Sequence, residues 1–337
     1  MVLIFFLALA SRFPYYTEKF YSRGIYQIIR NIDLFFLRWL PFSLGDLLYI
    51  FFLLWVIFRF IHFQSRNKII FIEKILWRIV WIFYFSWGLN YFRIPVSSRQ
   101  SLNLMPAENK TIAIITENII DSLNHLHLEL QPDTASKVHM PRFSIMKKKA
   151  EWLYRQQAHK YPYLYMPYYV IKPSMLSYIV SYAGISGYFN PFTHEAQYNQ
   201  FYPLSFRPHI ILHELAHQIG YAYENEAEYI AWQTAIENGD NLFRYAAHLN
   251  ALTYFLNYWY VTDKKQWKNF QKRLLPAIQN TLADVQKFQK KYYISIDLSR
   301  PYHYYLKINQ KGKGQESYSE LMLYIIAYYQ KHHYLKK

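Results

Sequence analysis

The sequence contains no cysteine among its 337 residues, and this absence removes several classes of site. Disulfide bonds, thiolate ligands for zinc or iron–sulfur clusters, and a cysteine nucleophile are all excluded. Glycine and proline are also scarce, at 9 and 14 residues, which excludes collagen-like and linker-like chains. Acidic residues number 22 against 38 Lys and Arg, so the net charge is +16. Any metal site in this chain must therefore use histidine and oxygen ligands.

Apolar and aromatic residues are abundant instead, at 53% and 20% of the chain. A disordered protein is excluded, because such chains lack the apolar surface that offsets the entropy cost of ordering. The positive charge suits nucleic acid, an anionic membrane surface, or neither. No segment carries a nucleic-acid-binding motif, so we expect no nucleic-acid partner.

Long apolar runs fill residues 1–92 and predict a membrane region. Residues 42–63 hold only Asp46 and Arg59 as charges, near the two ends, and about 20 apolar residues cross a bilayer core. Residues 75–92 form a second predicted span, rich in Trp and Tyr, and residues 1–10 a short third candidate. We interpret these runs as helices that contact lipid, rather than as two helices buried in the core of a soluble protein.

The loop charges set an expected orientation. Arg66 and Lys68 lie between the two stronger spans, and such short basic loops stay in the cytoplasm. Residues 93–337 then face the opposite side, although the loop before residue 42 is also basic and favours the reverse topology.

Beyond residue 92 the pattern becomes that of a folded domain. Residues 93–108 are expected to be a linker, and residues 109–337 a mostly helical α+β domain. Isoleucines and leucines recur at helical spacing within residues 111–130, and strands are expected near residues 168–171 and 186–191.

A histidine motif within this domain predicts zinc chemistry. His213, Glu214 and His217 form H-E-x-x-H, and residues four apart share one face of a helix. Two imidazoles on consecutive turns bind one zinc ion, while Glu214 reaches a zinc-activated water as general base. The surrounding residues are apolar, so the helix is expected to be buried and its polar side chains to need partners. Two hydrogen-bonded core histidines are the alternative.

A third ligand is required, with water in the fourth position. The metzincin pattern would place histidine at position 223, where this chain has Tyr223. Glu224 begins E-x-x-A-E, which resembles the E-x-x-A-D pattern of Glu-liganded zincins. We therefore predict Glu224 as the third ligand and Glu228 as the residue that orients a ligand histidine, with Glu226 and Glu228 as the alternative ligands.

Two further site features are expected. Residues 186–192 combine β-prone residues with glycine and proline, and we expect a peptide substrate to pair along them as an added strand. An oxyanion stabiliser is also needed, and Tyr318 is the first choice, with Tyr302 and His303 as alternatives.

Several motifs together resemble one family over nearly the full length. They are Tyr21-Ser22-Arg23-Gly24, Pro41-Phe42-Ser43-Leu44-Gly45-Asp46, Lys172-Pro173-Ser174, Ser181-Tyr182-Ala183-Gly184, Asn190-Pro191-Phe192-Thr193, His213 to Gly220, and Ser317-Tyr318. The chain resembles the bacterial membrane zincins catalogued as domain-of-unknown-function family 3810. The resemblance implies an integral membrane protein with a zinc-peptidase-like domain and names no substrate. The family usually has Asn where this chain has Glu228.

The sequence thus predicts a zincin-like metallopeptidase domain behind N-terminal transmembrane helices. We expect zinc-dependent peptide hydrolysis in a bacterial inner membrane, with the catalytic domain on the extracytoplasmic side. One alternative is a non-catalytic membrane protein whose zinc stabilises a partner-binding domain; its site would be closed by a fourth ligand, His209 or Glu226. A zinc amidase acting on cell-wall peptide is the other alternative.

Overall fold

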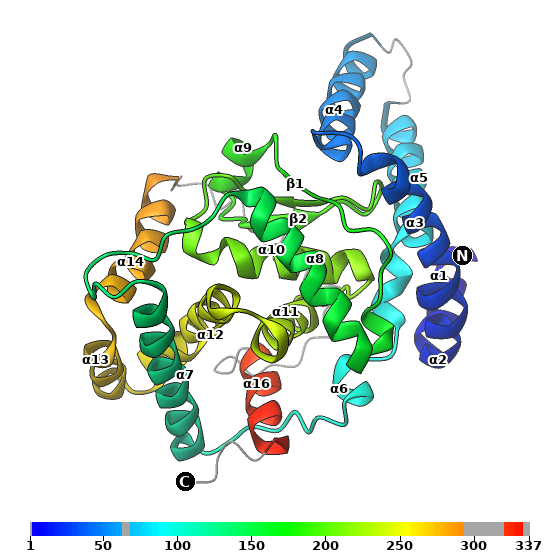
Figure 1. The fold of residues 1–337 in the computed structure, drawn as a ribbon. Coiled ribbons are helices and arrows are strands. Elements are labelled where there is room, and N and C mark those ends of the chain that lie inside the picture. Colours follow the sequence, from blue (N-terminus) through cyan, green and yellow to red (C-terminus); the bar gives the residue numbers. More distant parts are fainter. Residues whose placement is uncertain (1, 63–67, 293–319, 333–337) are drawn as a thin grey trace.

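The protein is mostly helical with one small sheet, in a computed structural model that describes residues 2–62, 68–292 and 320–332. The expected α+β class with dominant helix is confirmed at this level. Figure 1 shows the N-terminal helices gathered along one side of a larger helical body, with the pair α4 and α5 extending beyond it.

The N-terminal helices pack on one another through aromatic side chains. Trp55 of α4 and Phe71 of α5 have ring centres 6.2 Å apart. The elements in chain order are α1 (Val2–Arg12), α2 (Pro14–Tyr16), a π-helix (Thr17–Ile25), α3 (Tyr26–Leu37), α4 (Leu44–His62) and α5 (Lys68–Ser86).

Helix α4 is the one helix among the described residues that is long and apolar enough to cross a membrane. It has 19 residues, close to the span expected at residues 42–63. Large apolar side chains such as Phe51 and Ile61 are exposed along it, at 62% and 68% of their surface. Helix α1 has only 11 residues, and α5 carries Glu73, Lys74 and Arg78 within its length.

The span expected at residues 75–92 has different bounds. Helix α5 begins at Lys68 and ends at Ser86, and a 3₁₀ turn (Gly88–Phe92) follows. Trp87 and Tyr91 are buried against the helical body, together with Asn90. An aromatic run has the same composition whether it faces lipid or a protein core, so composition alone placed the end of this helix too late.

Residues 93–102, the first part of the expected linker 93–108, are packed into the body, and most of residues 103–108 are exposed. The buried guanidinium of Arg93 donates to Glu18 at 2.9 Å, which joins this segment to the N-terminal helices. A short helix, α6 (Val96–Arg99), follows, and the backbone N–H of Val96 donates to Glu226 at 2.7 Å.

The sheet has three short strands in the order β1-β3-β2. Strands β1 (Ile171–Pro173) and β3 (Ala196–Tyr198) are parallel, and β2 (Gly187–Phe189) runs antiparallel to β3. The strand expected at residues 168–171 lies mostly before β1, and the one expected at 186–191 contains β2. Because β2 pairs with β3 on one side only, its other edge carries no strand among the residues that the structure describes.

The remaining helices surround a core in which α10 is central (Figure 1). The isoleucines and leucines predicted at helical spacing, such as Ile115, Ile119 and Leu123, form the buried face of α7. These helices are α7 (Asn109–Leu130), α8 (Phe143–Lys160), α9 (Ser177–Tyr182), α10 (Arg207–Ile219), α11 (Glu224–Asn238), α12 (Asn241–Thr262), α13 (Lys264–Arg273), α14 (Pro276–Lys291) and α16 (Glu320–Lys331), with 3₁₀ turns at Pro162–Leu164 and Leu204–Phe206.

Candidate metal centre

Helix α10 carries the histidine motif and is buried from Pro208 onward. Its polar residues are surrounded by Ile and Leu, so no face of the helix suits water. Pro208 lies in the first turn, where its missing N–H costs nothing, and Gly220 ends the helix with φ at 110°. His213 and His217 lie on one face, with ring centres 4.7 Å apart.

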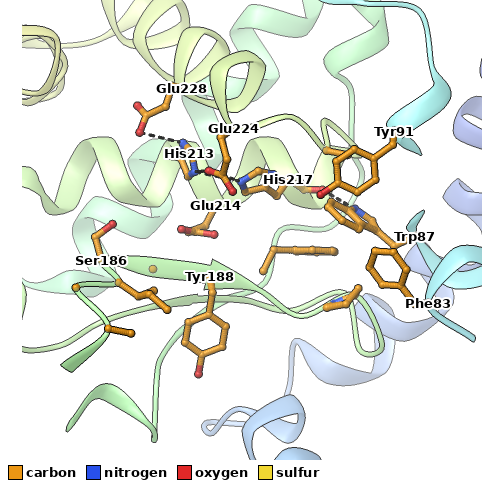
Figure 2. Close-up of a pocket in the computed structure, with 17 residues that line it drawn as sticks. Phe83, Trp87, Tyr91, Ser186, Tyr188, His213, Glu214, His217, Glu224 and Glu228 are labelled. Atoms are coloured by element: carbon orange, nitrogen blue, oxygen red, sulfur yellow. Dashed lines mark hydrogen bonds and ion pairs between the residues drawn. The ribbon is translucent and has the colours of Figure 1, made fainter. Parts of the chain in front are cut away.

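The left-handed turn at Gly220 lets the chain reverse into α11, whose first residue is Glu224. Oε2 of Glu224 lies 3.2 Å from Nε2 of His213 and 3.5 Å from Nε2 of His217. The two Nε2 atoms are 3.1 Å apart. Figure 2 shows these three side chains converging from the two helices. In the part of the chain that the structure describes, this is the one group whose ligand atoms all lie within 4.8 Å of one another.

Each histidine ring has a neighbour on the side that faces away from Glu224, and only that of His217 forms a hydrogen bond. Nδ1 of His217 lies 2.7 Å from the carbonyl oxygen of Tyr221. A carbonyl only accepts, so Nδ1 carries the proton and Nε2 presents its lone pair to the cluster. Nδ1 of His213 lies 3.5 Å from Oε1 of Glu228.

Glu228 is itself fixed by two neighbours. Its Oε2 lies 2.6 Å from Nε2 of His209 and accepts from the Asn250 side-chain amide at 2.9 Å. Glu228 therefore lies behind His213, and its predicted role in orienting that ring stays a prediction. His209, the candidate fourth ligand of the non-catalytic alternative, is engaged with Glu228 and lies outside the cluster.

Glu214 faces a cleft next to the cluster. Its carboxylate packs against Gly187 of β2 so closely that a Cβ there would lie 2.6 Å from Oε1 of Glu214. Oε2 of Glu214 is buried and has no hydrogen-bond partner among the described residues. The cleft holds about 350 Å³ and is lined by His213, His217 and Glu224 on one side and by β2 on the other.

The charges of this cluster are strongly coupled. Burial disfavours a charged His213, but the Glu228 and Glu224 carboxylates outweigh burial and raise its pKa to about 10. Burial also opposes ionisation of Glu228, yet the two histidines beside it lower its pKa to about 2. For Glu214 burial dominates and raises the pKa to about 7. The buried carboxylates thus favour a positive charge beside the imidazoles.

The other predicted site residues lie elsewhere. Glu226 is buried on the opposite side of α11, where its carboxylate accepts from the Val96 N–H. It therefore lies outside the cluster, as the angle of about 200° between positions two apart on a helix requires. Tyr318, with the alternatives Tyr302 and His303, lies outside the described residues.

Sequence reasoning missed an aromatic group at the end of α5. Phe83, Trp87 and Tyr91 line the cleft, and we call these three residues the aromatic wall (Figure 2). The indole N–H of Trp87 donates to the His217 carbonyl at 3.2 Å. All three fall inside the run interpreted as a membrane span, and the polar Asn90 within that run was the available signal that its end packs against the body.

Comparison with curated proteins and with solved structures gives no match. A family model described as "Protein of unknown function (DUF3810)" matches residues 21–326. This match covers α3 to α5, the sheet and the candidate metal centre, and it confirms the family to which the sequence motifs pointed. The chain therefore belongs to the DUF3810 family.

Proposed function

We propose that this protein is a membrane-anchored, zinc-dependent metallopeptidase. The observation that carries the proposal is the spacing of three ligand atoms, which are 3.1, 3.2 and 3.5 Å apart. Ligands bound at 2.0–2.2 Å to a tetrahedral zinc ion lie about 3.4 Å from one another. His213, His217 and Glu224 therefore fit three positions around one zinc ion, which leaves the fourth for water or substrate.

The donor set also favours zinc. Two imidazole nitrogens and one carboxylate oxygen suit zinc rather than calcium or magnesium, which prefer oxygen ligands alone. When bound, zinc supplies the Lewis acidity that polarises a peptide carbonyl and makes water more acidic. Glu214 then takes the proton from the attacking water and delivers it to the leaving amine. Its buried Oε2 without a partner suits a group that must accept a proton from a transient molecule.

The open edge of β2 supports a polypeptide substrate. The N–H of Asn190 donates to the Glu195 carbonyl, and that of Asn199 donates to the Ser186 carbonyl. Inter-strand bonds in an antiparallel pair alternate, so the backbone groups of Gly187 and Phe189 point to the open edge. That edge borders the cleft beside Glu214, and an extended peptide paired with it would pass the cluster.

The two alternative functions are a structural zinc site and a zinc amidase, and the contacts of the described residues bear on them differently. A closed structural zinc site needs a fourth protein ligand, and the two residues predicted for it are engaged elsewhere among the described residues: His209 with Glu228 and Glu226 with Val96. This favours a catalytic site over a structural one. A zinc amidase acting on cell-wall peptide would use the same groups, so only its substrate separates it from a peptidase.

The membrane location is part of the proposal. Helix α4 has the length and composition of a span, and its apolar side chains are exposed rather than packed. An anchor in a bacterial inner membrane, with the helical body on the extracytoplasmic side, follows from the basic loop between α4 and α5.

Metal content and hydrolysis of the full chain in detergent test the proposal. We expect about one zinc ion per chain in the wild type and in Glu214→Gln, and none in His213→Ala. Hydrolysis of a mixed peptide pool, or of cell-wall peptides for the amidase, should fall at least about 100-fold in Glu214→Gln. Unchanged hydrolysis in Glu214→Gln would refute the mechanism, and a folded wild type without zinc would refute the metal site.

A further inference from the structure

Helices α4 and α5 form a hairpin that we propose lies in the membrane, and we call it the membrane hairpin. The cleft takes part of its lining from α5. Phe83 lies in the last turn of α5, and Trp87 and Tyr91 follow directly after it. These residues form the aromatic wall, with ring centres of Phe83 and Trp87 5.9 Å apart and those of Trp87 and Tyr91 5.5 Å apart. Trp87 also packs on Phe189 of β2 at 5.2 Å, so the wall closes one end of the cleft.

The opposite face of the same helical turn is exposed and apolar. Phe85 and Trp81 are each two positions from Phe83, which places them about 160° away around the helix. Phe85 is 61% exposed and Trp81 is 43% exposed. The end of α5 thus presents Phe83 to the cleft and Trp81 and Phe85 to the surroundings of the hairpin. The two faces are separated by about one helix diameter of 10–12 Å.

The other end of the membrane hairpin holds the edge strand. The hydroxyl of Tyr188 in β2 donates to Oδ1 of Asp46 at 2.5 Å, and the N–H of Met175 donates to its Oδ2 at 2.7 Å. Asp46 is in the first turn of α4 and is completely buried. Figure 2 shows Tyr188 pointing away from the metal cluster, on the far side of β2. The strand lies between α10 and the first turn of α4.

Both ends of the hairpin therefore meet the body beside the cleft. Helix α4 has 19 residues and a length of about 28 Å, which matches a bilayer core of about 30 Å. The bilayer surface must then lie near the first turn of α4 and the last turn of α5. The first turn of α4 carries Asp46, which bonds β2. The last turn of α5 carries Phe83 and leads into the rest of the aromatic wall.

We infer that the substrate is a polypeptide tethered to the same membrane and cut close to the bilayer surface, with an apolar side chain against the aromatic wall. This inference rests on the proposed peptidase function for its reaction and on the geometry of the hairpin for its substrate class. A strand added to β2 would lie beside the turn of α4 that bonds Tyr188, close to where an anchored chain leaves the bilayer.

Spacer length tests the inference in vesicles. The full chain is reconstituted in phosphatidylcholine vesicles with a mixed peptide pool joined to phosphatidylethanolamine by Gly/Ser spacers of about 4 or about 20 residues, which reach about 14 and about 70 Å when extended. We expect the two pools to be cleaved at rates within about threefold, and both faster than the same pool dissolved at equal concentration. Cleavage that requires the long spacer would overturn the inference.

A binding measurement separates this inference from the proposed function. The zinc-loaded Glu214→Gln variant is photo-crosslinked to the same tethered pools, which needs no hydrolysis. If the wild type cleaves nothing while the short-spacer pool crosslinks at the cleft, the peptidase function fails and the substrate class stands. Crosslinking of the long-spacer pool alone would overturn the substrate class whatever the activity.

A matched pair of variants on α5 tests the aromatic wall. In the Glu214→Gln background, Phe83→Ala should reduce crosslinking of a tethered peptide with Leu in the cleft about fivefold relative to one with Ser, as loss of an apolar contact predicts. Phe85→Ala, on the opposite face of the same turn, should leave that ratio unchanged. Equal ratios in the two variants would overturn the role of the wall.

Discussion

Glu228 lies behind His213 with Oε1 3.5 Å from its Nδ1, whereas the Tyr221 carbonyl bonds Nδ1 of His217 at 2.7 Å. Both contacts lie on the Nδ1 side, so each Nε2 is directed at Glu224. The contact to His217 is made by the backbone carbonyl of Tyr221, so it does not depend on a side chain. The contact to His213 depends on one side chain, which is in turn fixed by His209 and Asn250. Outer contacts of this kind determine ring orientation and ligand basicity at metal sites.

Replacing Glu228 should therefore weaken metal binding without abolishing it. We expect Glu228→Ala to bind zinc about 10–100-fold more weakly than the wild type, in competition with a chelator of known affinity. Glu226→Ala is the matched control, because Glu226 is also buried on α11 but faces Val96. It should lose stability and keep its zinc affinity. An equal loss of affinity in both variants would show that Glu228 acts only through folding.

Much of the candidate site could be predicted from the spacing of residues in the sequence. His213, Glu214 and His217 lie within one helix, where positions fix relative directions, so their arrangement followed from the sequence. Glu224 lies across a turn, and its placement next to the histidines required a motif as a guide. Asn250 lies 22 positions after Glu228 on another helix, and no local pattern connects the two.

At the scale of elements, β2 is the part that would bring substrate backbone and Glu214 together in the proposed peptidase. It is only three residues long, yet it touches Glu214 through Gly187 and is bonded to α4 through Tyr188. A side chain at position 187 would displace either the strand or the carboxylate, since its Cβ would also meet the Gln197 carbonyl at 2.9 Å. The glycine is there for close approach rather than for an unusual φ.

Gly187→Ala should therefore impair hydrolysis while the metal site stays intact. We expect kcat to fall about 100-fold, because a misplacement of about 1 Å at a catalytic group has that effect, with zinc content unchanged. Gly184→Ala is the control, since a Cβ there meets nothing within 4 Å although its φ of 70° strains alanine. It should lower thermal stability and keep kcat within about threefold. Similar kcat values for both variants would argue against steric contact with Glu214.

Element boundaries were less predictable than the motif. The end of α5 was expected near residue 92, but the helix ends at Ser86 and the following residues enter the cleft. Lipid-facing and core-facing aromatic residues have the same composition, so only tertiary contacts separate them. The small sheet shows a similar limit, because three-residue strands are too short for a clear alternating pattern.

At the scale of the whole molecule, the N-terminal helices and the body share buried charged contacts. The Lys172 ammonium donates to Oε1 of Glu195 at 2.7 Å and to the carbonyl oxygens of Leu37 and Phe42. Oε2 of Glu195 accepts from the backbone N–H of Gly45, at the start of α4. This one ion pair therefore joins β1, the segment after α3 and the first turn of the proposed membrane span.

Breaking this pair should loosen the membrane hairpin from the body. Lys172→Met leaves Glu195 buried without its cation, which costs about 3–5 kcal/mol for a buried pair. Lys172→Met combined with Glu195→Gln should recover part of that loss, because no unpaired charge then remains. Thermal unfolding in detergent measures both, with Arg273→Met as control for the exposed pairs with Glu117 and Asp121, each worth at most about 1 kcal/mol. Limited proteolysis should also find residues 38–43 more accessible in Lys172→Met alone.

If Lys172→Met is no less stable than Arg273→Met, the ion pair does not hold the hairpin to the body. The proposed proximity of the cleft to the bilayer then depends on Asp46 and the aromatic wall alone.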